Sequence, residues 1–348
     1  MLKYIVQKLA YALLTLFGVI TVIFFLFTVL PDPAKMMLGQ NQTEEQLETV
    51  REKYGFDKPV FTQYLYYLND LSPISFHSGN PSDYTYPDEG KYEALQLFSV
   101  GNVRVVLKLP YLRESFQKSG KEVSAIIAET LPNTLVLAAS AIAIAIILGI
   151  FLGIVSALNK DSWLDNAIQV FSTVGMSVPS FFSAIIFAWL FGYVLHEFTN
   201  LNMTGSLYEL DNFGESYDLK LKNLILPAIV LGIRPVAVVV QLMRNSLLET
   251  MQQDYIRTAR AKGLSMPRVI RKHALKNSLN PVVTTISGWF AGMLTGAVFV
   301  EYIFGWNGLG KELVEALNKL DLPVIMGAVL CIATIFILIN IFVDVVYA

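Results

Sequence analysis

Long apolar runs without a charge dominate the hydrophobic pattern of the chain. A helix needs about 20 apolar residues to cross a membrane, and the first run, Leu9–Leu30, contains no charged residue. It lacks the short apolar core and small-residue cleavage site of a secretory signal, so we expect it to remain in the mature chain. The expected spans are 1–30, Leu131–Leu158, Leu164–Leu195, Leu221–Met243, Val282–Ile303 and Val324–Val346. Six spans place both termini on one side.

The third run is too long for one straight crossing. It contains the sequence SVPSFF, beginning at Ser177. Because the ring of Pro179 removes a backbone N–H and clashes with the preceding turn, we expect a break or kink there.

The segment between the first two spans, residues 31–130, is too long to be a simple loop. Thr43–Tyr54 has the pattern of an amphipathic helix, and residues 72–90, rich in Ser, Pro, Gly and Asp, are expected to be irregular. Leu97–Leu109 alternates like a strand and suggests a hairpin. The predicted fold is therefore an all-α integral membrane protein with a small extracytoplasmic subdomain. Its parts are the span 1–30, the segment 31–130 and a core of five spans over 131–348.

Charge placement predicts the orientation. The chain is 54% hydrophobic and 16% charged, whereas a soluble domain carries about a quarter charged residues. Basic residues gather before the first span and between the fourth and fifth spans: Lys3, Lys8, Arg244, Arg257, Arg260, Lys262, Arg268, Arg271, Lys272 and Lys276. The alternate connections are more acidic. The positive-inside rule therefore places the termini and the basic stretch in the cytoplasm.

The sequence offers no catalytic chemistry. A single cysteine, Cys331, and three dispersed histidines give no metal-ligand spacing. The run Gly305–Lys311 matches GxxxxGK, but Glu312 stands where a nucleotide-binding loop needs Ser or Thr for magnesium. We expect a chain that is not an enzyme, has no catalytic residue, metal or cofactor, and binds no nucleic acid.

Arg234 is the one charge near the middle of a span. Such a residue is costly in lipid and is treated as functional by default. It either meets a substrate group in a translocation cavity, pairs with a backbone carbonyl freed by Pro235, or extends toward the membrane surface. With Ser177 and Pro179 it forms our candidate translocation pathway. No acidic or histidine group lies deep in a span, which argues against a proton-coupled carrier and leaves the chain without an energy source of its own.

Two glycine repeats have the spacing that lets helices approach closely in lipid. They are Gly149 with Gly153, and Gly288 with Gly292 and Gly296. Packing inside the chain is one interpretation and a subunit interface is the other.

The basic stretch Asp254–Pro281 is predicted to form two short helices. Asp254 is a suitable N-cap for a helix Tyr255–Lys262, Gly263 suits the position after its end, and Ser265 with Pro267 can begin the next helix. Ile256, Ala259 and Gly263 share one side that carries little bulk. Topology alone and anionic-lipid binding explain the charges, whereas a protein dock also explains the small residues.

These residues resemble a known family, the membrane permease subunit of ABC importers of the dipeptide/oligopeptide/nickel type. The segments YIRTARAKGLS (255–265) and RKHALKNSLNP (271–281) resemble its cytoplasmic EAA loop, here 248–281. The other matching segments are KLAYALLTLFGVITVIFF, YGFDKPVFTQYLYYL, ETLPNTLVLA, SVPSFF, LPAIVLG, EYIFGWNGLGKELVEAL and NIFVDVVYA. An insertion around 72–109 departs from the family pattern.

The resemblance implies a type I importer permease of six transmembrane helices in which Tyr255–Gly263 is a coupling helix seated in an ATPase subunit. It implies these coupling residues: Tyr255, Ala259, Arg260, Ala261, Lys262, Gly263, His273 and Asn277. The implied partners are a second, homologous permease, two ABC ATPase subunits that bind ATP and magnesium, an extracytoplasmic solute-binding protein and membrane lipid.

The expected function is therefore that of a multi-pass permease for peptides in a bacterial or archaeal cytoplasmic membrane. A nickel chelate, an oligosaccharide or another solute is the alternative cargo, because the fold does not determine it. A stand-alone channel or a membrane scaffold is the alternative class.

Overall fold

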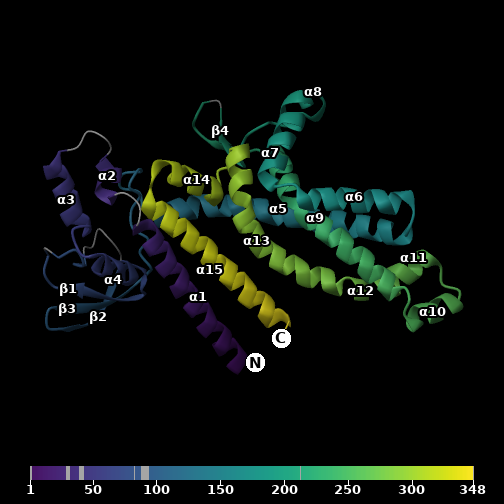
Figure 1. The fold of residues 1–348 in the computed structure, drawn as a ribbon, viewed down its shortest axis with the longest axis horizontal. Helices are drawn as coiled ribbons and strands as arrows, with labels where there is room; N and C mark the ends of the chain where they lie inside the picture. Colours follow the sequence, from purple (N-terminus) through teal and green to yellow (C-terminus); the bar gives the residue numbers. More distant parts are fainter. Residues whose placement is uncertain are drawn as a thin grey trace. The chain divides into compact units, whose positions relative to one another are not determined.

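The computed structural model describes residues 2–28, 32–38, 43–81, 83–87, 94–211 and 213–347. The chain divides into two compact units. The helical unit comprises Met1–Val6, Thr130–Val314 and Thr334–Ala348, and the mixed unit comprises Gln7–Glu129 and Glu315–Ala333. Helices α1, α5, α14 and α15 each contribute residues to both units; Figure 1 shows where these helices lie along the chain.

The long helices agree with the expected spans. They are α1 (Leu2–Thr28), α5 (Val123–Leu158), α9 (Lys222–Thr250), α13 (Asn280–Phe304) and α15 (Leu322–Tyr347). Each contains a stretch long and apolar enough to cross a membrane. Helix α6 (Trp163–Ser177) and the helix that begins at Ser180 are together apolar enough for a further crossing, but they meet at a bend of 109°. If this bent pair is one broken span, it is the sixth crossing. Among the described residues, the number of spans is thus five or six.

The expected break at Pro179 is confirmed. Helix α6 ends at Ser177, and Pro179 is the N-cap of α7 (Ser180–Trp189), which continues through a π-helical turn, η1 (Leu190–Val194), and α8 (His196–Thr199). By contrast, α9 runs uninterrupted through Pro227 and Pro235. Two short strands, β4 (Tyr208–Leu210) and β5 (Tyr217–Leu219), then form an antiparallel pair that the sequence analysis did not predict.

Helices of the helical unit pack through small residues. Its largest core cluster includes Ala141, Ala184 and Ala297 from α5, α7 and α13. A Cβ on Gly149 or Gly153 would lie 2.6 Å from Val239 or Met243 of α9, so these two glycines permit close approach within the chain. A Cβ on Gly288 or Gly292 would meet nothing within 4 Å. Internal packing thus explains the first repeat and not the second.

The loop after α13 folds around a buried carboxylate. Glu301 is fully buried, and its Oε2 accepts hydrogen bonds from the backbone N–H groups of Gly310 (2.7 Å) and Lys311 (3.2 Å) at the start of α14 (Leu309–Lys319). A Cβ on Gly308 would collide with that carboxyl group. Although Glu301 lies near the end of a span, its side chain is therefore buried in the protein. The GxxxxGK run instead directs backbone amides to the chain's own carboxylate.

After α1, the mixed unit continues with short helices α2 (Pro33–Leu38), α3 (Glu44–Tyr54) and α4 (Val60–Leu71). The amphipathic helix expected at 43–54 is confirmed, and Thr43 caps it by a reciprocal pair of bonds with Gln46. The Phe24 ring of α1 contacts Tyr64 and Tyr67 of α4, with centroids 5.2 and 5.7 Å apart. Burial raises the pKa of Tyr67 to about 12.

A three-stranded antiparallel sheet completes the mixed unit, in the order β1-β3-β2. The expected hairpin is confirmed as β2 (Ala94–Val100) and β3 (Val103–Lys108). Strand β1 (Ile74–Ser78) pairs with the other side of β3. The prediction that residues 72–90 are irregular is therefore wrong at β1, because the strand is specified by its partner and not by its own composition. Residues 82 and 88–93 lie outside the described part.

Candidate functional site: a basic helical hairpin at the end of α9

The basic stretch folds onto the C-terminal half of α9. Helix α10 (Asp254–Ala261) is followed by α11 (Met266–Val269), a π-helical turn η2 (Ile270–Ala274) and α12 (Leu275–Ser278). A hydrophobic cluster binds them together; its buried members are Ala157, Val239, Met243, Leu247, Ile256, Ala259, Val269, Ala274 and Val282. Burial of this face holds α10 in place, since a helix of this length is marginal alone.

Two of the three residues on the bare side of α10 are buried. Ile256 is fully buried and Ala259 is 6% exposed, both within the cluster against α9. Ala259 is thus small at a position where α9 and the following helices lie close to it. Arg260, Ala261, Lys262 and Gly263 are exposed instead.

Two of the expected coupling residues contact each other. The side-chain amide of Asn277 on α12 donates a hydrogen bond to the Tyr255 hydroxyl on α10, at 2.8 Å. His273 is half-buried in η2. The N-cap of α10 is Gln253, one residue before the expected Asp254, and Gly263 has φ +79°, the left-handed conformation expected after a helix end.

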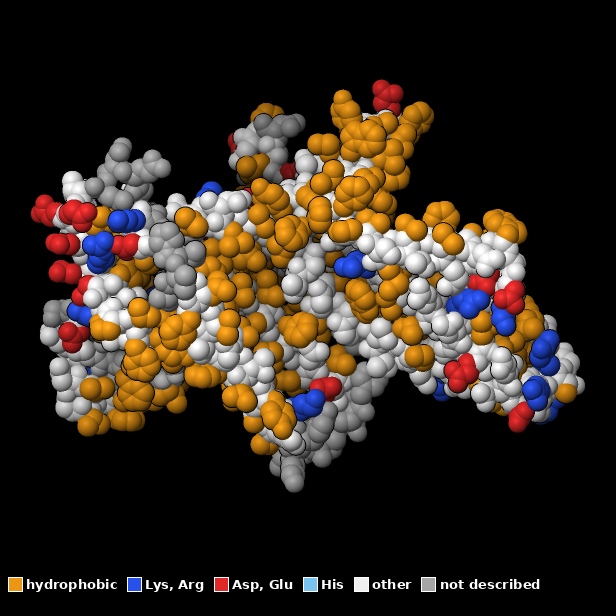
Figure 2. Space-filling view, in the orientation of Figure 1, with side chains coloured by type: hydrophobic (Ala, Val, Ile, Leu, Met, Phe, Trp, Pro, Cys, Tyr) orange, Lys and Arg blue, Asp and Glu red, His pale blue; other side chains and the backbone are white. Residues whose placement is uncertain are grey.

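The outer surface of this hairpin is strongly basic. Seven exposed side chains carry the charge: Arg257, Arg260, Lys262, Arg268, Arg271, Lys272 and Lys276. Figure 2 shows basic groups at the end of the helical unit where Figure 1 places α10 and α11. In this region Asp254 is the one exposed acidic residue among residues 254–278. Such a surface favours binding to an acidic groove of another protein or to anionic lipid.

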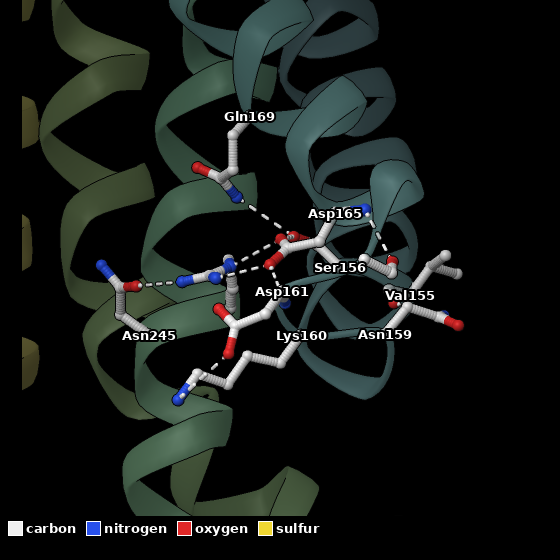
Figure 3. Close-up of polar contacts among 10 residues, drawn as sticks. Val155, Ser156, Asn159, Lys160, Asp161, Asp165, Gln169 and Asn245 are labelled. Carbon is white, nitrogen blue, oxygen red and sulfur yellow. Dashed lines mark hydrogen bonds and ion pairs between the residues drawn. The ribbon is translucent and has the colours of Figure 1, made fainter.

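A buried ion pair connects α6 to α9 within the same unit. The guanidinium of Arg244 binds the carboxylate of Asp165 through Nε (2.8 Å) and a terminal nitrogen (2.6 Å). Asp165 is 1% exposed, and it also accepts bonds from the Ser156 hydroxyl and the Asp161 backbone N–H. Figure 3 shows Gln169 extending the network to Ser156 at 3.1 Å. This two-pronged geometry orients the beginning of α6 against the part of α9 that supports the basic hairpin.

Sequence reasoning missed Asp165 and counted Arg244 only as a loop charge. A signal was present: Asp165 is the only acidic residue within the expected third span, and Arg244 directly follows the expected fourth span. Two charges at span ends predict a pair only if the helices are known to be adjacent, and their separation of 79 residues hides that adjacency.

The candidate pathway residues gather at the bend between α6 and α7. Arg234 of α9 is exposed, and its Nε donates to the Met176 carbonyl at 3.4 Å. Ser177 and Pro179 follow Met176 directly and are also exposed. Of the alternatives left open for Arg234, pairing with a backbone carbonyl is the one observed, although the carbonyl belongs to α6 and not to the turn before Pro235. Within the described residues, no group of three His, Cys, Asp or Glu side chains is arranged to hold a metal ion.

A mostly helical chain with five or six apolar spans and a basic hairpin on one end is a multi-pass membrane component of a transport system, as comparison with known proteins shows. The model of the family described as "Binding-protein-dependent transport system inner membrane component" matches residues 149–348, and the model of its N-terminal region matches residues 1–78. The chain belongs to this family.

Named relatives match the whole chain. It is 33% identical to a di/tripeptide transport system permease protein, DppB, of Pseudomonas aeruginosa, over 100% of this chain and 97% of that protein. It is 34% identical to a putative peptide permease protein of Brucella suis, with the same two coverages. A solved inward-facing methionine ABC transporter matches 64% of this chain and 95% of its own, with 15% identity and a TM-score of 0.48.

Proposed function

We propose that this chain is the permease subunit of an ATP-driven importer of peptides. The main support is that relatives named as di/tripeptide, dipeptide or peptide permeases match this chain at 32–34% identity over its full length. The similarity covers both the spans and the mixed unit. It therefore supports a shared class of cargo more strongly than a similar fold alone would.

The energy comes from partner ATPases. The exposed face of α10, with Arg260, Ala261 and Lys262, is the proposed seat of an ATPase subunit that binds ATP and magnesium. Movement of that subunit is passed to α9 through the buried cluster under Ile256 and Ala259. This chain supplies no catalytic group of its own in the proposal; it converts a displacement at α10 into a displacement of α9.

A second, homologous permease completes the pathway. The open glycine stripe at Gly288 and Gly292 on α13 supports a helix–helix contact between subunits, because a Cβ there meets nothing within this chain. An extracytoplasmic solute-binding protein delivers the peptide. We place the complex in a bacterial or archaeal cytoplasmic membrane with both termini in the cytoplasm, since the basic hairpin must face the ATPases.

Reconstitution of the complete complex into vesicles tests the proposal. ATP hydrolysis should rise when the binding protein is supplied with a mixture of short peptides, and labelled peptide should accumulate inside. If a nickel chelate or an oligosaccharide stimulates ATP hydrolysis and peptides do not, the proposal that the cargo is a peptide is wrong. Vesicles that contain this chain alone should not pass peptide, and conduction by them would support a channel instead.

A further inference from the structure

The three-stranded sheet of the mixed unit has one face made almost entirely of apolar side chains. The strand register aligns Ile74 with Leu107 and Leu95, Phe76 with Val105 and Phe98, and Ser78 with Val103 and Val100. Opposed residues point to the same side of a sheet. This set, which we call the apolar sheet face, comprises Ile74, Phe76, Ser78, Leu95, Phe98, Val100, Val103, Val105 and Leu107.

The apolar sheet face is open. Apart from Ser78 and the central Val105, its residues are 43–68% exposed. Figure 2 shows hydrophobic side chains gathered where Figure 1 draws β1, β2 and β3. A contiguous apolar surface of this kind is rarely left in contact with water.

The opposite face carries the polar and charged groups. His77, Arg104 and Ser99 are aligned across the three strands on that side, as are Ser75, Val106 and Gln96. Lys108 is buried there and donates to the Asp70 carbonyl of α4. The two basic side chains of the sheet, Arg104 and Lys108, thus both avoid the apolar sheet face, which is the division expected at a boundary between lipid and water.

Helix α4 connects this face to a membrane-spanning helix. The hydroxyls of Thr21 and Tyr64 are 2.7 Å apart. Thr21 lies six residues before Phe27, where the apolar stretch of α1 ends, which is about 9 Å along the helix axis at 1.5 Å per residue. Helix α4 therefore contacts α1 at a depth that belongs to the membrane.

One side of α4 joins two exposed apolar residues to the sheet. Phe61 and Leu65, four residues apart on α4, are exposed, and Asn69 follows at the same spacing. The Asn69 side chain holds the backbone of Phe76 by two bonds, donating to its carbonyl at 2.9 Å and accepting from its N–H at 2.8 Å. These bonds occupy the free edge of β1 at Phe76. Strand β1 is thus held beside the exposed side of α4 that carries Phe61 and Leu65.

We propose that the apolar sheet face rests on the membrane, against the lipid acyl chains and headgroups at the C-terminal end of α1. A transient partner such as a binding protein is a poorer fit, because non-obligate interfaces are only about as apolar as ordinary protein surface. The sheet lies at the interface and not in the hydrocarbon centre, since the free edge of β2 still needs water for its backbone groups. The insertion around 72–109 would then hold the three-stranded sheet at a set height on the bilayer surface.

Neighbouring residues on β2 provide a matched test, because Phe98 and Ser99 are both exposed but point to opposite faces. In a Cys331→Ser background, nitroxide labels are placed at Phe98→Cys, Val100→Cys and, as control, Ser99→Cys. The complete complex is studied in phosphatidylcholine and phosphatidylglycerol bilayers. Collision with oxygen, which concentrates in lipid, is compared with collision with a water-soluble nickel chelate.

We expect the ratio of oxygen to nickel collisions to be severalfold higher at positions 98 and 100 than at 99. Equal nickel access at 98 and 99 would place the face in water and overturn the proposal. Shielding of 98 and 100 from both reagents would also overturn it, since a protein partner would then cover the face. Brominated lipid should quench the fluorescence of Phe98→Trp but not that of Ser99→Trp. This measurement uses no nitroxide and so checks that the label itself does not draw the strand to the bilayer.

Discussion

The side-chain amide of Asn277 donates a hydrogen bond to the Tyr255 hydroxyl across 2.8 Å and so joins α12 to α10. The buried cluster fixes the inner side of α10, and this bond fixes an exposed side. Helix α10 is therefore attached to its neighbours on two sides, which suits an element that must pass on a displacement instead of absorbing it.

Tyr255→Phe and Asn277→Ala should each reduce the amount of peptide transported per ATP hydrolysed, with little loss of stability. An exposed neutral bond contributes toward the lower end of about 0.5–1.5 kcal/mol. Thr258→Ala is the control, because the Thr258 hydroxyl bonds only within α10, to the Asp254 carbonyl. The double variant should be no worse than the more severe single one, and additive losses would show that the two residues act separately.

Removal of the Asp165 carboxylate should be among the most destabilising changes in the helical unit. Asp165→Ala leaves Arg244, whose side chain is 18% exposed, without its charge partner, and breaking a buried pair costs about 3–5 kcal/mol. The melting temperature of the purified complex measures the loss. Asp161→Asn is the matched control: its side chain is 81% exposed, and asparagine tolerates its positive φ of 63°. Equal melting temperatures for the two variants would contradict the account.

Substitution by alanine should have opposite effects on the stability of this chain at a packed glycine, Gly310, and at an open one, Gly288. Gly310→Ala places a Cβ 2.5 Å from Val298 Cα and 2.8 Å from Glu301 Oε2, and such overpacking costs about 1–3 kcal/mol. Gly288→Ala should leave this chain as stable or up to about 1 kcal/mol more stable, because alanine favours a helix, yet weaken its association with the second permease. Thermal unfolding and co-purification separate the two effects. A stability loss at Gly288 equal to that at Gly310 would show that the open stripe is packed internally.

Arg234→Ala should lower peptide uptake while expression and ATPase association remain normal. Its guanidinium is exposed beside the bend at Ser177 and Pro179 and holds a carbonyl of α6, so its loss frees that end of the helix and removes a positive charge from the candidate pathway. Arg234→Lys tests charge alone, because lysine lacks the planar fork. Steady-state uptake is the measurement, and normal uptake by Arg234→Ala would exclude a role in translocation.

Local features could be predicted from the sequence. The capped helix after Thr43, the hairpin around Gly101 and the break before Pro179 each depend on a few consecutive residues, and the structure has all three. Features that need distant partners could not. Strand β1 exists because β3 pairs with it, Asp165 finds its partner 79 residues away, and the amides of Gly310 and Lys311 bond to the Glu301 carboxylate.

Which side of α10 faces outward could not be predicted from the sequence. Small residues at helical spacing fit a partner's groove and a crowded interior equally well. Ala259 occupies the interior, against α9, and Ala261 occupies the exposed side. Only the position of α9 decides between them.

These two alanines also provide the most direct test of the central claim, that the exposed side of α10 couples this chain to an ATPase. Ala261→Trp and Ala259→Trp are compared in the reconstituted complex for melting temperature of the chain, ATPase co-purification and peptide uptake. Ala261→Trp should leave the melting temperature unchanged but abolish ATPase association and uptake, whereas Ala259→Trp should lower the melting temperature by overpacking the cluster. Full ATPase association and uptake with Ala261→Trp would contradict the account.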